Sequence, residues 1–293
     1  MIEIRKLTKK YGAQTAVDRI ELRLDRGIYA LLGPNGAGKT TFLNMLMGAI
    51  SPDGGEMLFD GASLAKDRRA FNARVGYLPQ APLFYKEFSG REFLDYVCVL
   101  KTVPKRERGE AIERALREVN LSGAAEKRIG AYSGGMRQRL GIAQALLGDP
   151  EILVFDEPTA GLDPIERIRF RNTISRMSAE KTVLIATHIV PDVESIAQTV
   201  ILMKDGVILD EASPEALIEK VDGKVWQTSA AIDGADRYLD THRISNIQLA
   251  NQQYTLRIVS DERPDACAEP VPPRLEEAYI YLTGGNRDDA PEG

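Results

Sequence analysis

Residues 33–40 read Gly33-Pro34-Asn35-Gly36-Ala37-Gly38-Lys39-Thr40, and they follow the apolar run 28–32. This spacing matches G-x-x-x-x-G-K-[ST], a pattern whose glycines let backbone N–H groups approach a phosphate closely. The helix that we expect next presents its positive N-terminus to the same anion. In this pattern Lys39 reaches the β- and γ-phosphates of a nucleotide, and Thr40 places its hydroxyl on Mg²⁺. Because the match lies between an apolar strand and a helix, it favours a phosphate-binding loop over a glycine-rich turn without a ligand.

A second glycine-rich turn precedes another expected helix. Ser133, Gly134 and Gly135 stand directly before the amphipathic run 137–147. Ser133 is suited to cap this helix, and the two glycines leave backbone N–H groups open to an anion. The turn alone would be an unremarkable helix cap, so its interpretation depends on the other motifs.

A pair of carboxylates ends a buried strand. Residues 152–155 are all apolar, and Asp156 and Glu157 follow them. Such a run rarely ends in two acidic side chains without a cation. The arrangement suits Mg²⁺ at Asp156 and a base or water-orienting group at Glu157.

The apolar strands alternate with helical segments, which predicts an α/β fold with a mainly parallel sheet covered on both faces. We expect strands at 2–7, 20–24, 28–32, 152–155 and 183–186, a helix at 40–50, mainly helices within 87–147, and short strands and turns at 51–80.

The chain divides into a larger segment, 1–220, and a smaller one, 221–293. The smaller segment carries 7 Lys/Arg and 13 Asp/Glu, so we do not expect it to bind anionic lipid or phosphate. In this region we expect a short helix at 213–220, strands near Val225 and at 254–259, a break at the prolines 270–273, a last helix at 275–282 and a frayed polar end at 286–293.

The bulk composition is that of a globular protein. Hydrophobic residues make up 43% and charged residues 28%, and the net charge of −5 gives no basic field for nucleic acid. The two cysteines, Cys98 and Cys267, lack a metal-binding or redox spacing, which indicates a reducing compartment. No run approaches the length of a membrane helix, and the start lacks a signal-peptide core. We therefore expect a cytosolic chain whose membrane role comes through a partner.

The order of these motifs resembles that of ABC-type nucleotide-binding subunits, and the resemblance covers residues 2–220. It implies a P-loop ATPase domain with a helical subdomain at about 85–150 and a small C-terminal α+β extension. It also implies ATP and Mg²⁺ as ligands and ATP hydrolysis as the activity.

The resemblance assigns roles to single residues. Tyr11 matches the aromatic residue that stacks on adenine, and His188 matches the switch histidine at the γ-phosphate. Gln80 matches the glutamine that senses Mg²⁺ and faces the membrane partner. Taken singly, each of these three has an ordinary structural interpretation, and their joint order overrides it. The remaining matches are the phosphate loop from Gly33 to Thr41, the signature from Ser133 to Gln138, the carboxylates Asp156 and Glu157, and the loop at Leu162-Asp163 that crosses to the partner subunit.

Two positions of the signature depart from the commonest family pattern. Tyr132 stands where leucine is usual, and Met136 stands where glutamine is usual. The serine and both glycines are kept. We therefore expect altered packing or turnover at this motif, with the phosphate contacts retained.

Partners also follow from the resemblance. Paired subunits hold ATP between the phosphate loop of one and the signature of the other, which implies a homodimer or a paired heterodimer. A separate polytopic membrane subunit would dock near Gln80, on residues 81–88. The tail is similar to that of bacterial exporter ATPases, so we expect export from the cytoplasmic face of the membrane. The alternatives are a soluble ABC-type ATPase acting in translation or on DNA, and a non-catalytic subunit; the intact Lys39, Asp156, Glu157 and His188 argue against the latter.

Overall fold

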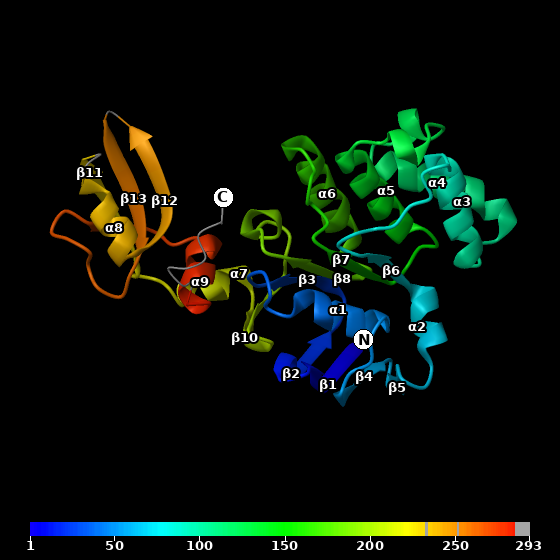
Figure 1. Ribbon diagram of the computed structural model, residues 1–293, viewed down its shortest axis with the longest axis horizontal. Helices are drawn as coiled ribbons and strands as arrows, with labels where there is room; N and C mark the ends of the chain where they lie inside the picture. Colours follow the sequence, from blue (N-terminus) through cyan, green and yellow to red (C-terminus); the bar gives the residue numbers. More distant parts are fainter. Residues whose placement is uncertain (232–233, 251, 285–293) are drawn as a thin grey trace. The chain divides into compact units, whose positions relative to one another are not determined.

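The computed structural model describes residues 1–231, 234–250 and 252–284, and the chain divides into two compact units, Met1–Ile208 and Leu209–Gly293 (Figure 1). The sequence places the division after Lys220. One reason is that α7 (Pro214–Glu219) packs on α9 (Leu275–Leu282) and so joins the second unit; the boundary itself falls within β10 (Val207–Ala212). The polar end that we expect at 286–293 lies outside the described residues.

A six-stranded sheet forms the centre of the first unit. The strand order is β10 (Val207–Ala212), β9 (Thr199–Lys204), β3 (Gly27–Leu32), β8 (Thr182–Thr187), β7 (Ile152–Asp156) and β6 (Val75–Leu78). Strands β7 and β8 are buried along their whole length, which agrees with the apolar runs 152–155 and 183–186. The pairs β9–β3, β3–β8, β8–β7 and β7–β6 are parallel, which agrees with the predicted α/β class.

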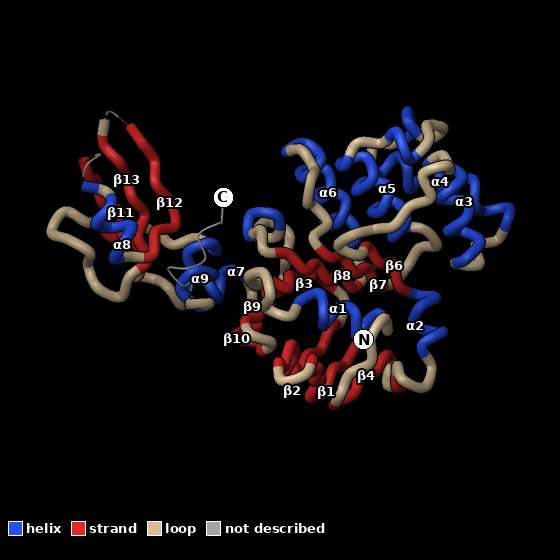
Figure 2. Tube along the Cα trace, viewed as in Figure 1, coloured by secondary structure: helices blue, strands red, loops and turns tan. Residues whose placement is uncertain are grey.

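A second, antiparallel sheet covers one side of this centre, with α1 (Lys39–Met47) between them (Figure 2). Apolar residues of α1, including the fully buried Phe42, Leu43 and Met45, belong to one core with residues of both sheets. The phosphate-binding candidate loop therefore starts from a buried strand and ends in a buried helix. The antiparallel sheet consists of β2 (Gln14–Leu24), β1 (Ile2–Tyr11), β4 (Gly54–Phe59) and β5 (Ala62–Ser63).

Three helices that pack on one another form the helical part of the first unit: α3 (Gly90–Leu100), α4 (Lys105–Glu118) and α5 (Gly134–Leu146). α3 begins with a capping box in which Ser89 and Glu92 exchange bonds. At the far end of α5, the Lys101 ammonium donates to the carbonyl of Leu147 at 2.8 Å, and burial lowers its pKa to about 8.

Further short elements complete the first unit. α2 (Arg68–Arg74) lies where the sequence indicates only strands and turns; Asp67 caps it and Phe71 anchors it in the core. α6 (Pro164–Met177) is capped by Asp163. The 3₁₀ turns are Ser122–Ala124, Ile129–Ala131 and Val190–Asp192.

The second unit is a small antiparallel sheet with helices. Its order is β12 (Arg243–Ala250), β13 (Gln253–Val259), β11 (Val225–Ala231) and β14 (Glu269–Pro270), and its other helix is α8 (Asp236–Thr241). Glu277 of α9 is 2% exposed and accepts bonds from Arg257 Nε at 2.7 Å and Ser245 Oγ at 2.9 Å. This buried ion pair fixes α9 to the sheet.

Within the described part of the chain, none of the helices combines the length and apolar character needed to cross a bilayer.

Candidate active site

The predicted site residues gather at one edge of the six-stranded sheet. Parallel strands end at the same edge, and β3, β8, β7 and β6 are neighbours (Figure 1). The register pairs Leu32 with Thr187, Ala186 with Asp156, and Phe155 with Leu78. Gly33, His188 and Glu157 directly follow β3, β8 and β7 and therefore lie at this edge, where Asp156 ends β7. Gln80 lies two residues beyond the end of β6.

Glycines shape the loop that follows β3. Gly36 and Gly38 have φ values of 81° and 102°, a left-handed range that side chains disfavour. A Cβ on Gly38 would also collide with the carbonyl of Ala16 and lie 2.8 Å from the Cε of Met203. The loop can therefore turn tightly and expose its N–H groups only with glycine at these positions.

Lys39 folds back over this loop. It is 6% exposed, and its ammonium donates to the carbonyls of Gly33 at 2.6 Å and Pro34 at 3.0 Å. Burial lowers the pKa of Lys39, while Glu157 and Asp156 act in the opposite direction. The structure thus holds a cation where the motif requires one for a phosphate.

Asp156 is buried without a partner. It is 1% exposed, and both of its carboxylate oxygens lack a hydrogen-bond partner. Burial raises the pKa of Asp156; nearby Thr40 and Lys39 oppose this, and Glu157 adds to it. A buried carboxylate without partners is costly, so this position suits a divalent cation. Among the described residues no three His, Cys, Asp or Glu side chains cluster as a metal cage, so a cation here would need oxygens from water and phosphate.

Glu157 is held in a strained backbone conformation. Its φ is 49°, a region that costs free energy for a non-glycine residue. Its Oε2 accepts from the hydroxyl of Thr187 at 3.0 Å, and its Oε1 lies 2.9 Å from His188 Nδ1. The two carboxylate oxygens are thus oriented by the end of β8.

Two residues contact Glu157 in a way that the sequence did not predict, although Gln138 stands in the signature. Thr187 binds its carboxylate, and Gln138 of α5, 8% exposed, donates to the carbonyls of Glu157 at 3.2 Å and Pro158 at 3.0 Å. A buried glutamine on the signature helix is the signal that could have found the second contact. It ties that helix to the segment carrying the carboxylate.

The signature turn, Ser133–Gly135, starts α5. Ser133 and Gly134 are exposed, and the Ser133 hydroxyl accepts from the Met136 N–H at 3.2 Å. Tyr132, by contrast, is 4% exposed, and its hydroxyl donates to the carbonyl of Ala124 at 2.7 Å. The unusual tyrosine therefore packs inward, while the expected phosphate contacts stay at the surface.

Tyr11 and Gln80 lie exposed at the ends of β1 and β6. The Tyr11 ring is 51% exposed and has the Lys9 ammonium 5.6 Å from its centroid. Their predicted contacts with adenine and Mg²⁺ stay predictions.

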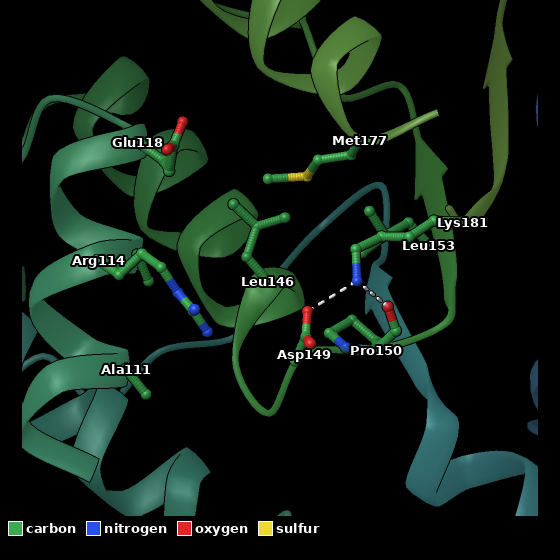
Figure 3. Close-up of a pocket in the computed structure, with 10 residues that line it drawn as sticks. Ala111, Arg114, Glu118, Leu146, Asp149, Pro150, Leu153, Met177 and Lys181 are labelled. Carbon is green, nitrogen blue, oxygen red and sulfur yellow. Dashed lines mark hydrogen bonds and ion pairs between the residues drawn. The ribbon is translucent and has the colours of Figure 1, made fainter. Parts of the chain in front are cut away.

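A cavity of about 200 Å³ lies elsewhere in the first unit (Figure 3). Leu146, Leu153 and Met177 supply apolar walls, and the ion pair between Lys181 and Asp149 lies at its side. It contains none of the predicted site residues, so it is distinct from the nucleotide site.

The fold and this site define a class: an α/β P-loop nucleotide-binding protein with a helical subdomain that carries a second glycine turn. A family model described as ABC transporter matches residues 17–160. The chain is 38% identical over 214 residues to the bacitracin transport ATP-binding protein BcrA of Bacillus licheniformis, which covers 72% of this chain and 69% of that protein. It is 30% identical over 299 residues to the Nod factor export ATP-binding protein I of Rhizobium meliloti (strain 1021), covering 98% and 89%.

A solved structure supports the fold. A bacterial ABC transporter cassette has a similar fold, with a TM-score of 0.68, 24% identity and coverage of 73% of this chain and 98% of that chain. The chain belongs to the ABC transporter ATP-binding family. It is the ATP-binding subunit of an ABC transporter, an ATPase whose hydrolysis is coupled to transport, which confirms the activity expected from the sequence.

Proposed function

We propose that this chain hydrolyses ATP as one of two paired subunits, with Glu157 as the base. One observation carries the proposal: a buried, strained Glu157 held by Thr187 and His188, directly after the partnerless Asp156. Two buried carboxylates at the end of a buried strand, beside a phosphate-binding loop, are typical of a hydrolytic site.

The phosphate loop and Lys39 bind the nucleotide in this proposal. Lys39 exchanges its bonds to the Gly33 and Pro34 carbonyls for bonds to the β- and γ-phosphates. The N–H groups of residues 33–41 cradle the same oxygens, and Tyr11 stacks on the adenine through its exposed ring face.

Mg²⁺ would be held by Asp156, Thr40 and Gln80. The partnerless oxygens of Asp156 and the position of Thr40 beside it support this assignment. When bound, the ion neutralises charge on the phosphate oxygens.

Glu157 accepts a proton from the attacking water. The water oxygen forms a bond to the γ-phosphorus, the bond to the bridging oxygen breaks, and ADP leaves. Thr187 fixes the carboxylate, and His188, half exposed beside it, contacts the γ-phosphate. Gln138 holds the backbone of the same segment, so Glu157 stays in register while the chemistry proceeds.

A second subunit completes the ATP site in this proposal. The exposed Ser133 and Gly134 offer a hydroxyl and N–H groups at a helix N-terminus, suited to the γ-phosphate in a second subunit. The similar cassette described above was solved as a dimer, which supports this arrangement. The loop at Leu162-Asp163 lies close by, since the carbonyl of Gly161 is the nearest atom to a Cβ on Gly135, at 3.1 Å.

A membrane subunit docks on residues 81–88, here called the docking segment. Leu83 is 91% exposed, and Tyr85 packs against Phe88 and against Tyr96 of α3, at centroid distances of 5.1 and 5.6 Å. An exposed apolar and aromatic cluster of this kind fits a protein partner. The location would then be the cytoplasmic face of the membrane, and the relatives named for bacitracin transport and Nod factor export favour export.

Two measurements test the proposal. Purified protein should hydrolyse ATP only with a divalent cation, and the Glu157→Gln variant should bind ATP and dimerise with little turnover. Full hydrolysis by a variant that remains monomeric would contradict it.

A further inference from the structure

Tyr132 is a buried side chain next to an exposed turn. Its hydroxyl donates to the Ala124 carbonyl at 2.7 Å, and its own carbonyl accepts from Arg137 Nη1 at 2.6 Å. The residue is therefore held at both ends, in the segment before the signature turn and in the first turn of α5.

Gly90, the first residue of α3, makes room for this tyrosine. A Cβ on Gly90 would collide with the Tyr132 hydroxyl, and would lie 3.3 Å from both the Tyr132 Cζ and the Ala125 carbonyl. Gly90 does not have a left-handed φ, so its backbone would accept alanine. The tyrosine, and not the backbone, requires glycine here.

The segment before the signature turn also pairs with the residues around the end of the docking segment. The Ile129 N–H donates to the Phe88 carbonyl at 2.8 Å, and the Gly130 N–H donates to the Lys86 carbonyl at 2.9 Å. Arg91 donates from its backbone to Ala125 at 2.9 Å. These bonds and the Tyr132 hydroxyl join the docking segment, the start of α3 and the signature turn.

We propose that Tyr132 is a positioning residue for ATP-driven pairing: its hydroxyl, seated over Gly90 and bonded to Ala124, sets the signature turn relative to the docking segment. The inference rests on the proposed function, in which that turn closes on ATP in the second subunit. A leucine at this position has no hydroxyl to bond Ala124, so the segment before the turn would keep its backbone bonds and lose this side-chain bond.

The test uses the full chain with Glu157→Gln as the parent, so that ATP-bound pairs accumulate. Tyr132→Phe removes only the hydroxyl; it should weaken ATP-driven dimerisation in sedimentation about fivefold, the scale of one neutral hydrogen bond. The chain should stay folded, with only the small drop in unfolding midpoint expected from the loss of one neutral hydrogen bond. The affinity of the monomer for a fluorescent ATP analogue should change little. Tyr29→Phe is the matched control, since its hydroxyl accepts from the Asp25 N–H at 3.0 Å elsewhere in the same unit; dimerisation should stay at the parent level.

The second arm tests the pair through rescue. Gly90→Ala should weaken dimerisation more than about tenfold, because the added methyl displaces the tyrosine. The double variant with Gly90→Ala and Tyr132→Leu should dimerise as strongly as Tyr132→Leu alone. Such a non-additive result is expected only for residues in contact. The proposal would be overturned if Gly90→Ala dimerised as the parent does, or if Tyr132→Leu did not rescue it. It would also be overturned if Tyr132→Phe lost its fold and its ATP affinity together.

Failure of the proposed function is separable from failure of this inference. If the Glu157→Gln parent does not dimerise with ATP, the paired-subunit model is wrong and the role of Tyr132 in pairing falls with it. If the parent dimerises and the Tyr132→Phe and Gly90→Ala variants dimerise equally well, the paired-subunit model stands and only the role of Tyr132 is overturned.

Discussion

His188 Nδ1 lies 2.9 Å from Glu157 Oε1, so the two candidate catalytic side chains are in direct contact. Glu157 is almost fully buried, whereas the side chain of His188 is 48% exposed. Glu157 therefore occupies Nδ1 of the imidazole, and Nε2 is the ring nitrogen left for a phosphate oxygen in the proposed mechanism.

Lys39→Ala should remove the phosphate-binding cation. The ammonium makes charge-assisted bonds, each worth about 1.5–3 kcal/mol, so ATP affinity should fall about 10- to 100-fold and hydrolysis should be lost. Titration with a fluorescent ATP analogue measures the affinity. Lys66→Ala, an exposed lysine, serves as the control, and parental affinity in Lys39→Ala would show that the loop has another role.

Asp156→Asn should stabilise the metal-free protein near neutral pH. Burial raises the pKa of Asp156, so the folded chain binds more protons at this site than the unfolded chain does between the two pKa values. Its contribution to stability is present at low pH and is lost as pH rises through the folded pKa. The variant should gain about 1–3 kcal/mol of unfolding free energy, because burying a neutral amide costs less than burying a charged carboxylate.

Two further measurements check the Asp156 assignment. The gain in unfolding free energy should shrink as pH falls toward the ordinary aspartate pKa of about 3.9, and Asp67→Asn at an exposed helix cap should show no such gain. The same Asp156→Asn variant should bind ATP more weakly with Mg²⁺. Unchanged Mg²⁺-dependent affinity would remove Asp156 from the metal site.

Leu83→Asp should weaken binding to the membrane subunit and leave ATP hydrolysis by the isolated chain unchanged. Leu83 is 91% exposed, so a carboxylate there costs the isolated chain little, but it would be unpaired in an apolar interface. We expect normal ATP hydrolysis by the purified variant. In washed membranes of cells that express the transporter, we expect at least tenfold less of the variant protein than of the parent. Leu239→Asp, 50% exposed in the second unit, is the control. Equal membrane recovery of both variants would exclude the docking segment.

Glu277→Ala should unfold the second unit selectively. It leaves Arg257, 12% exposed, without its carboxylate, and breaking a buried pair costs about 3–5 kcal/mol. Every predicted phosphate contact lies in the first unit, so ATP affinity should hold. Urea unfolding followed by the fluorescence of Trp226 measures the first effect. Loss of ATP binding in parallel would mean that nucleotide binding needs the second unit.

The sequence predicts the parts of the fold that depend on local pattern. The apolar runs of β7 and β8 and the strand–loop–helix around Lys39 are strong local signals. α2 was missed because Phe71 is its only buried residue, and β12 because its face is largely exposed. The unit boundary depends in part on α7 packing against α9, a contact between segments far apart in the chain.

The site residues also divide into those that a local motif marks and those that only the fold brings together. Motif residues such as Asp156 and Glu157 are recognisable because they are adjacent to each other and to a buried strand. Thr187 reaches Glu157 through the pairing of β7 with β8, and Gln138 reaches it through the packing of α5. The signature marks Gln138 as a motif residue, but the contact itself depends on the fold. The space that Gly90 leaves for Tyr132 likewise joins residues of two helices.

The measurement that tests the account most directly compares Glu157→Gln with the parent chain in ATP hydrolysis and ATP-dependent dimerisation. Glutamine keeps a carbonyl oxygen for Thr187 and removes the basicity that the water requires. Hydrolysis should fall by about 10²-fold or more, the scale of losing a positioned base, while ATP still binds and the closed pair persists. Parental turnover in Glu157→Gln would contradict the account and make His188 the first candidate for the base.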